Sequence, residues 1–248
     1  MINSISTRLR DATRFPVERR DTHTAQRPPD GVSFVVVSRG SSIEADVAML
    51  IEKRYAERGL RLGATGGNQC DQELTTIAAL HGSRVVATVS VRSDGPQGLL
   101  AEHLYPQEIE AHRKLGGRLC ELTRLAADPE FGSQPALASL FNAAYRVAVR
   151  TYGATDFVME VHPRHAAYYT RMAGCRIVGP ETLCPRVNAP AVLLHLPSRR
   201  VEDGICVASE KQTGASVARR SIYDYLQRAA ASSSIGTRWS PTWTPTSV

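Results

Sequence analysis

The chain has 248 residues, of which 42% are hydrophobic and 22% charged, a globular composition that excludes a wholly disordered chain. No apolar run reaches the roughly 18 residues of a membrane-spanning helix, and the arginine-rich start contains no apolar signal segment, so the sequence predicts a soluble, cytoplasmic protein without a transmembrane segment. Its five cysteines are an odd number without C-x-x-C spacing, which argues against a disulfide framework and a zinc ribbon.

Charge and composition also divide the chain into a core and two tails. Residues 1–31 combine arginines and prolines without apolar periodicity, and we expect a disordered basic arm there. Residues 229–248 are equally poor in side chains that could be buried and predict a disordered tail, which leaves 32–228 as the folded domain with a C-terminal helix. The net charge of +6 favours anionic partners without choosing among them.

The core alternates short strand patterns with helical ones. A buried strand is predicted first, then a helix that ends at Gly59, a hairpin that turns at His81-Gly82-Ser83, and a short helix from Pro106. A long helix follows between Pro135 and Gly153, because its apolar residues share one face. Strands are predicted at 32–38, 74–80, 84–92, 118–126, 155–162, 175–178 and 191–196, with a second short helix at 165–172. The fold class is mixed α/β (α+β), a twisted sheet flanked by helices.

This order of elements resembles the acyltransferase fold of the GNAT superfamily. Three strings are more specific: CELTRLAAD from Cys120, EVHPRHAAYYTRMAGCRIVG from Glu160, and CPRVNAPAVLLHL from Cys184. Together they are similar to the N-acyl amino acid synthases, relatives of the acyl-homoserine lactone (autoinducer) synthases. The resemblance implies a GNAT-like domain that moves a fatty acyl group from acyl carrier protein to the α-amine of an amino acid.

The link between strand 118–126 and the long helix supports the same donor on physical grounds. A coenzyme A pyrophosphate is usually held by a glycine-rich loop at a helix N-terminus, where backbone N–H groups point at the anion. Here the link contains one glycine, the acids Asp128 and Glu130, and Pro135, which lacks an N–H group. We expect no permanently bound cofactor, and an acyl-phosphopantetheine arm as donor, because that arm carries no pyrophosphate of its own when attached to a carrier protein.

Aminolysis of a thioester needs a proton acceptor and donors for the oxyanion. Glu121 is our first candidate for the base, and Arg124 is a candidate for holding Glu121 or a substrate carboxylate. Strict alternation would place these two on opposite faces, but a bulge, which is typical of this strand in GNAT proteins, would change that arrangement. An ion pair between them that only fixes the strand is an equally open interpretation.

Further candidates lie on the next strand and its helix. Glu160 and His162 are two residues apart, so a strand would place them on one face, and His162 is a second candidate base or a capping residue. Together with His165 they could suggest a metal, but their spacing mixes strand and helix, and we predict no metal site.

Four more residues are candidates for substrate binding. Tyr168 and Tyr169 stand where many GNAT enzymes have a tyrosine that protonates the leaving thiolate, although adjacent helical residues cannot both face one site, and core packing is expected for at least one. Arg164 and Asn188 could bind the amino acid carboxylate, or could stabilise a helix start and a turn instead.

The alternatives are an autoinducer synthase, an acyl-CoA-dependent GNAT enzyme, and a non-enzymatic binder of acyl chains or nucleic acid. The missing glycine loop disfavours coenzyme A, and no stripe of basic and aromatic residues supports nucleic acid, so no nucleic-acid partner is predicted. The expected partners are acyl carrier protein and an amino acid acceptor.

Overall fold

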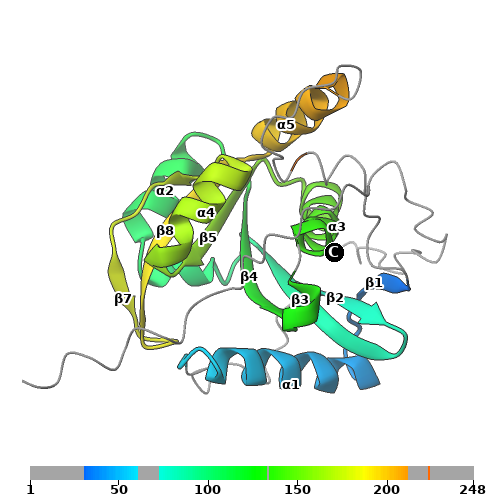
Figure 1. Ribbon diagram of the computed structural model, residues 1–248. Helices are drawn as coiled ribbons and strands as arrows, with labels where there is room; N and C mark the ends of the chain where they lie inside the picture. The colour runs from blue at the N-terminus through cyan, green and yellow to red at the C-terminus, as the bar shows by residue number, and fades with distance from the viewer. Residues whose placement is uncertain (1–30, 61–72, 133, 212–222, 224–248) are drawn as a thin grey trace, which may run out of the picture.

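A mixed sheet with helices on both faces organises the computed structural model, which describes residues 31–60, 73–132, 134–211 and 223 (Figure 1). Its strands are β1 (Val32–Val36), β2 (Leu74–His81), β3 (Arg84–Ser93), β4 (Leu119–Ala127), β5 (Asp156–Val161), β6 (Arg176–Ile177), β7 (Thr182–Cys184) and β8 (Ala189–Pro197). Their order is β1-β2-β3-β4-β5-β8-β6, and β7 pairs with β8. Only β4 and β5 pair in parallel among these strands; the other pairs are antiparallel.

The helices are α1 (Ser42–Ala56), α2 (Pro106–Lys114), α3 (Gln134–Tyr152), α4 (Pro163–Ala173) and α5 (Ser198–Lys211), with the short helices η2 (Leu100–His103) and η3 (Pro129–Phe131). On one face, α1 buries Val47 and Leu50 against Ala78 and Ala126. On the same face, α2 and η2 form a second cluster over β4, β5 and β8. The opposite face is covered by α3, whose small buried residues allow close contact with the sheet.

The cluster beneath α2 positions the site described below. Ile109 and Tyr105 are almost fully buried there against Val158 of β5 and Leu193 of β8. The Tyr105 hydroxyl donates a hydrogen bond to the Ala191 carbonyl at 2.8 Å. This packing holds η2 and α2 over the middle of the sheet, next to the parallel β4–β5 pair.

Most predicted elements are present with ends that differ by one to three residues, and the hairpin turns at residues 82–83 as expected. The strand β7 was not predicted, and α4 begins at Pro163 instead of His165. The predicted tails, apart from Gly31, lie outside the described residues, as does most of the segment after Lys211. Within the described part, no helix is both long and apolar enough to cross a membrane.

Candidate active site

The two parallel strands in the middle of the sheet pair over only three positions. Leu119, Cys120 and Glu121 of β4 are in register with residues 156–158 of β5. Beyond Glu121, β4 continues beside β3, and beyond Val158, β5 continues beside β8. Glu121 therefore stands at the last position of the parallel ladder.

A β-bulge follows directly in β4. Two steps along β3, from Thr88 to Ser90, face three steps along β4, from Ala126 to Thr123. Within the extra length, Arg124 has a φ of 52°, in the left-handed region that non-glycine residues rarely adopt. The bulge expected for this strand is confirmed. It shifts the alternation, so that Ala126 packs beneath α1 instead of joining Leu122 on the α3 face.

Glu121 is a buried carboxyl group with 1% of its surface exposed. Its Oε2 accepts a hydrogen bond from the Ala101 amide of η2 at 3.1 Å. Burial and, to a smaller extent, the charge of Glu160 raise the pKa of Glu121, the Ala101 amide opposes both effects, and the resulting pKa is about 7. A carboxyl group with this pKa can hold or release a proton near neutral pH.

Glu160 supplies a second carboxyl group on the same face of the sheet. It lies two residues beyond Val158, the register partner of Glu121, and two residues is the side-chain repeat of a strand. Its Oε2 forms an ion pair with Arg186 and accepts from the Cys184 thiol at 3.8 Å. Its Oε1 is buried without a hydrogen-bond partner among the described residues. Burial raises the pKa of Glu160, and Arg186 acts against that shift.

Arg186 joins the two sides of this site and was not among the predicted residues. It follows β7, and a second nitrogen of its guanidinium donates to the Leu100 carbonyl at 2.6 Å. The same side chain therefore holds Glu160 on β5 and η2, which binds Glu121. The signal available in the sequence was its place in the string CPRVNAPAVLLHL, beside the predicted Asn188.

Two residues predicted to bind substrate, Arg124 and Asn188, lie away from Glu121. No ion pair joins Glu121 to Arg124 among the described residues, so the interpretation of a strand-fixing pair is not supported. Arg124 instead lies near the Tyr55 hydroxyl at the end of α1, where its charge lowers the pKa of Tyr55 against the larger effect of burial. Asn188 is exposed in the turn before β8 with a φ of 51°, which agrees with the turn alternative.

His162 does not share a strand face with Glu160, and that expectation is wrong. The strand β5 ends at Val161, and His162 is the N-cap of α4, where its Nδ1 accepts from the Arg164 amide at 3.3 Å. The exposed Arg164 donates from Nε to His165 Nε2 at 3.2 Å. Helix capping, the alternative considered for His162, is thus present.

The two tyrosines of α4 diverge as helical geometry requires. Their rings contact each other edge to face at 5.3 Å. Tyr169 packs against the main core, and burial raises its pKa strongly, so core packing is confirmed for this one of the pair. Tyr168 is half-buried, and its predicted part in protonating a thiolate stays a prediction.

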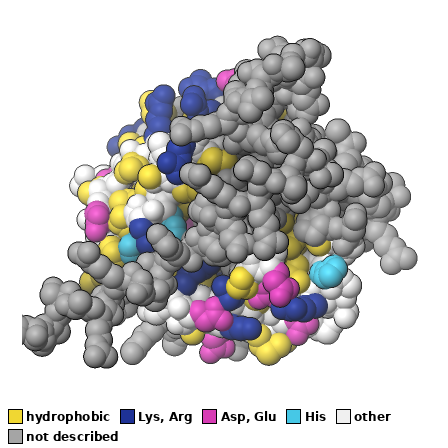
Figure 2. Space-filling view, in the orientation of Figure 1, with side chains coloured by type: hydrophobic (Ala, Val, Ile, Leu, Met, Phe, Trp, Pro, Cys, Tyr) yellow, Lys and Arg dark blue, Asp and Glu magenta, His cyan; other side chains and the backbone are white. Residues whose placement is uncertain are grey.

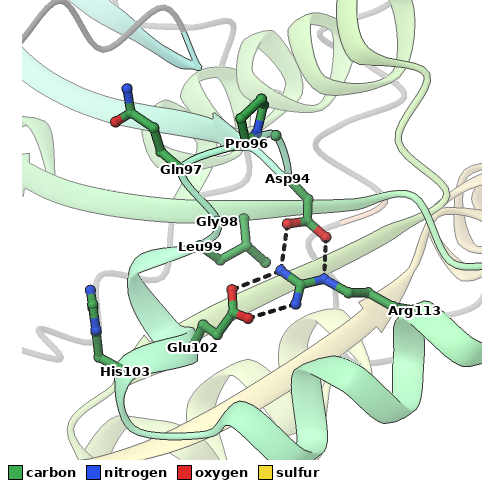
Figure 3. Close-up of a pocket in the computed structure, with 9 residues that line it drawn as sticks. Asp94, Pro96, Gln97, Gly98, Leu99, Glu102, His103 and Arg113 are labelled. Atoms are coloured by element: carbon green, nitrogen blue, oxygen red, sulfur yellow. Dashed lines mark hydrogen bonds and ion pairs between the residues drawn. The ribbon is translucent and has the colours of Figure 1, made fainter.

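A polar pocket of about 590 Å³ borders η2 (Figure 3). Arg113 of α2 reaches across its floor and binds both carboxylate oxygens of Asp94 and of Glu102, at 2.6 to 2.8 Å. Leu99, Glu102 and His103 of the lining flank Ala101, whose amide binds Glu121, so the pocket lies on the other side of η2 from that carboxyl group. The lining has two acids and one arginine, and Arg113 binds all four carboxylate oxygens of these acids.

A mixed sheet with one parallel strand pair, a bulge in β4 and helices on both faces is the arrangement of the GNAT fold. Solved structures agree. This fold is shared with FeeM, an N-acyl amino acid synthase from uncultured soil microbes, with a TM-score of 0.61 and 22% identity over 69% of this chain and 93% of that one. It is also shared with a protein from Lactobacillus plantarum described as an N-acetyltransferase, with a TM-score of 0.50 and 14% identity over 68% and 99%.

The chain belongs to the FeeM family of N-acyl amino acid synthases, because the family model matches residues 46–197, more than half of the chain. It is therefore an N-acyltransferase. A CoA-dependent acyl-homoserine lactone synthase, BjaI, has a TM-score of 0.49 and 16% identity, over 81% of this chain and all of that one. No curated protein matches the sequence.

Proposed function

We propose that this protein transfers a fatty acyl group from the phosphopantetheine arm of acyl carrier protein to the α-amine of an amino acid. The observation that carries the proposal is the pair of buried carboxyl groups at the end of the β4–β5 ladder. Glu121 has a pKa suited to a base near neutral pH, and Oε1 of the neighbouring Glu160 accepts no hydrogen bond from the part of the chain that the structure describes. An ammonium group that enters the site would find both an acceptor for a hydrogen bond and an acceptor for its proton.

The chemistry then has two proton movements. Glu121 takes one proton from the acceptor's ammonium group, and the neutral amine attacks the thioester carbonyl to form a C–N bond. As the tetrahedral intermediate collapses, the C–S bond breaks, the thiolate takes a proton from a donor side chain, the second amine proton restores that donor, and Glu121 releases its proton to solvent. Tyr168 is the candidate for the donor side chain. The products are an N-acyl amino acid and the free thiol of the arm.

The link between β4 and α3 supports a donor that is attached to a carrier protein. Asp128 at its start is buried and bound to Arg84 at 2.5 Å, so its charge is partly compensated, while Glu130 in η3 is exposed. The exposed carboxylate of Glu130 repels a pyrophosphate, and Pro135 has no N–H group to bind one. The argument from two repelling acids is thus reduced to one acid, Glu130.

An arginine-rich surface supports an acidic partner. Lys and Arg side chains gather over the part of the molecule where α4 and α5 lie (Figure 2). The exposed arginines of α4, β6 and α5 are Arg164, Arg171, Arg176, Arg199 and Arg200, and the exposed acids of α5 are Glu202 and Asp203. We refer to these five arginines as the basic surface. Because acyl carrier protein is acidic, this surface would increase its association rate at low salt.

The pocket beside η2 supports a small zwitterionic acceptor. Its two carboxylates exceed its one guanidinium, which favours an ammonium group, and its residues Leu99 and Glu102 flank Ala101, whose amide binds Glu121, so that group would be held near the buried carboxyls. For the acceptor's carboxylate, Arg124 remains a candidate, and Arg186 at the buried carboxyl pair is a new one, beside the earlier candidates Arg164 and Asn188.

The test compares acyl carrier protein and coenzyme A that carry the same acyl group, with the twenty amino acids as acceptors and mass spectrometry of the product. We expect kcat/KM to be at least about tenfold higher with the carrier protein, and to fall as salt rises. The double variant Arg171→Glu with Arg199→Glu should lose that preference, whereas Arg150→Glu, an exposed arginine of α3, should keep it. Equal rates from both donors would contradict the proposed donor.

The acceptor is tested in the same assay by adding S-adenosylmethionine. An N-acyl amino acid as the product supports the proposal. A homoserine lactone formed from S-adenosylmethionine would replace it with an autoinducer synthase, and a product from any other amine would overturn the proposed acceptor.

A further inference from the structure

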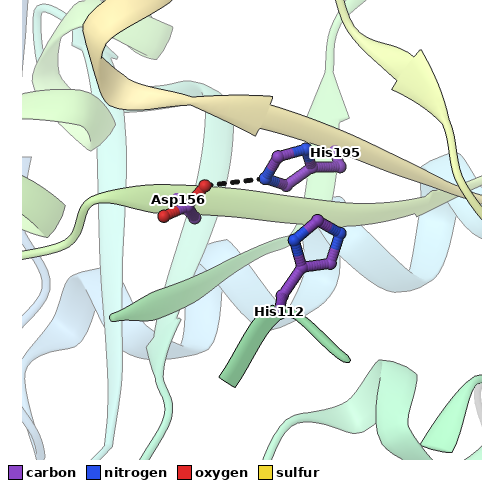
Figure 4. A group of neighbouring side chains, drawn as sticks. All are labelled: His112, Asp156 and His195. Atoms are coloured by element: carbon purple, nitrogen blue, oxygen red, sulfur yellow. Dashed lines mark hydrogen bonds and ion pairs between the residues drawn. The ribbon is translucent and has the colours of Figure 1, made fainter. Parts of the chain in front are cut away.

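Two histidines and an aspartate from three separate elements meet on the α2 face of the sheet (Figure 4). His112 is in the last turn of α2, Asp156 is the first residue of β5, and His195 is in β8. One potential ligand atom from each lies within 4.8 Å of the others. His195 Nε2 and Asp156 Oδ1 are 2.7 Å apart, and the two imidazole rings stack with centroids at 3.9 Å.

The topology of the sheet brings these residues together. In the β5–β8 ladder, His195 is the register partner of Val158, and Asp156 lies two residues before Val158, so all three point to the same face. Val158 packs beneath Ile109 of α2, and His112 is three residues after Ile109, on the same side of that helix. The cluster is thus built on packed core elements and not on loops.

We propose that His112, Asp156 and His195 bind a divalent transition-metal ion with the preferences of Zn²⁺. Imidazole nitrogens and carboxylate oxygens bind Zn²⁺ at about 2.0 to 2.2 Å, and a tetrahedral arrangement separates such ligand atoms by roughly 3.3 Å. Asp156 and His195 are already closer than that. A ligand nitrogen of His112 lies within 4.8 Å of both atoms, and its ring, now stacked on His195, would have to rotate to direct that nitrogen at the ion.

The surroundings of the carboxylate hold it in the fixed orientation that a metal ligand needs. The Thr155 hydroxyl donates to Asp156 Oδ2 at 2.7 Å and itself accepts from the Arg118 amide at 2.9 Å. Such second-layer hydrogen bonds fix the orientation of a ligand, and they direct Asp156 Oδ1 toward His195 Nε2, where the ion would lie between the two atoms.

Exposure leaves room for a fourth ligand. His195 is buried, with 8% of its surface exposed, whereas His112 and Asp156 are half-buried. A water molecule can therefore complete the coordination from the solvent side. Two imidazoles in the set disfavour Mg²⁺ and Ca²⁺, which prefer oxygen ligands.

The ion would connect α2 to the sheet without touching the reacting atoms. Asp156 and Glu160 are four residues apart on β5, which corresponds to about 13 Å. The helix α2 follows η2, and the Ala101 amide of η2 binds Glu121. A metal at His112 would therefore stabilise the elements that cover the carboxyl pair, and we assign it a structural part and no step in acyl transfer.

The experiment uses the full chain, with calorimetric titration of Zn²⁺ and with Co²⁺ as a spectroscopic probe. We expect one ion per chain and a Tm that rises by about 5 to 10 °C when free Zn²⁺ is one hundred times Kd. The Co²⁺ spectrum should lack the near-ultraviolet charge-transfer band of a cobalt–thiolate bond, because no cysteine belongs to the cluster.

The decisive variant is His112→Gln, because this half-buried helix residue can change without unfolding the core. We expect it to weaken Zn²⁺ binding at least about tenfold and to keep the metal-free Tm. His81→Gln, at the exposed end of the β2–β3 hairpin, is the matched control and should bind as the parent does.

Three results would overturn the proposal. The first is a chain that does not bind Zn²⁺, and the second is unchanged affinity in His112→Gln. The third is loss of binding in the double variant His162→Gln with His165→Gln, because it would place the ion at the start of α4.

Discussion

Burial gives the carboxyl group of Glu121 a property that an exposed glutamate lacks. Its pKa of about 7 results first from desolvation and then from the nearby charge of Glu160, while the Ala101 amide stabilises the ionised form. Near neutral pH both forms are populated, so the group can accept a proton from an amine and return it to solvent afterwards. The charge of Glu160, which is held in place by an ion pair with Arg186, contributes to the raised pKa of Glu121.

The first prediction concerns Glu121→Gln, which keeps the size of the side chain and removes the base. We expect turnover to fall by about a hundredfold to ten-thousandfold, because that is the usual contribution of a general base. The fold should remain, since a neutral amide is easier to bury than a carboxylate. Steady-state kinetics and thermal melting check both parts. Near-normal turnover would transfer the role to His162, and His162→Ala should then be the inactive variant.

The second prediction is a pH dependence with a definite sign. Turnover should rise with pH through about 7, because only the ionised form of Glu121 accepts a proton.

The stability of the folded protein should change with pH in the opposite direction. The folded-state pKa of Glu121 exceeds the ordinary glutamate value of 4.5, so the folded protein binds the proton more tightly. This contribution to stability is full below about 4.5 and lost as pH rises through about 7.

The variant Glu121→Gln is the control for that pH dependence. Its Tm, relative to the parent, should be higher at pH 8 than at pH 5, because the parent alone must bury a charge at the higher pH. A Tm difference that does not change with pH would show that Glu121 has an ordinary pKa.

For individual residues, the sequence predicted which side chains belong to the site better than it predicted their contacts. Glu121 and Glu160 could be placed on neighbouring strands because both lie in recognisable strings. Arg186 could not, since its contacts with Glu160 and Leu100 depend on the path of the chain after β7. His162 was misplaced because β5 ends one residue earlier than its apolar pattern, where Pro163 begins a helix.

The bulge in β4 is the feature that determines which face each later residue of that strand occupies. It places Ala126 beneath α1 and leaves Arg124 with a positive φ beside Tyr55. Such a backbone conformation costs a non-glycine residue about 1 to 3 kcal/mol, and bulges are frequent next to active sites. The bulge could be expected from the family resemblance alone, because no glycine marks it in the sequence.

The third prediction separates the backbone of Arg124 from its charge. Arg124→Gly removes the guanidinium at a position that glycine adopts without strain, whereas Arg124→Val adds a β-branched side chain there. We expect Arg124→Val to lose about 1 to 2 kcal/mol of stability and Arg124→Gly to lose less. If Arg124 binds the acceptor's carboxylate, both variants raise KM. Normal KM in Arg124→Gly would limit this residue to shaping the strand.

Long helices and strands with a regular apolar pattern were predicted better than short ones. The long helix α3 and the hairpin of β2 and β3 have strong periodicity and a clear turn, and both were predicted closely. The strand β7 has three residues and is followed by Pro185, so no sequence pattern distinguishes it from a loop. Its pairing with β8 is nonetheless what brings Cys184 and Arg186 to Glu160.

On the scale of the whole molecule, a residue far along the chain returns to the core. Tyr223 has 8% of its surface exposed, and its hydroxyl donates to the carbonyl of Ala173, the last residue of α4. Its ring lies so close to Gly204 of α5 that a Cβ on that glycine would clash with it. Tyr223 therefore packs against both α4 and α5. The folded part of the chain therefore includes a residue beyond 211.

The last prediction tests the domain boundary that the sequence suggested at residue 228. Removal of 229–248 should change the Tm by no more than a few degrees, because that segment has few side chains that could be buried. Removal of 212–248 should lower it clearly, since it deletes the buried aromatic ring of Tyr223, and loss of such a ring typically costs about 3 to 5 kcal/mol. The full-length variant Tyr223→Ala is the matched control and should reproduce most of the larger loss. If both truncated chains melt within a few degrees of the parent, the domain ends at α5. If removal of 229–248 already lowers the Tm strongly, the domain extends beyond residue 228.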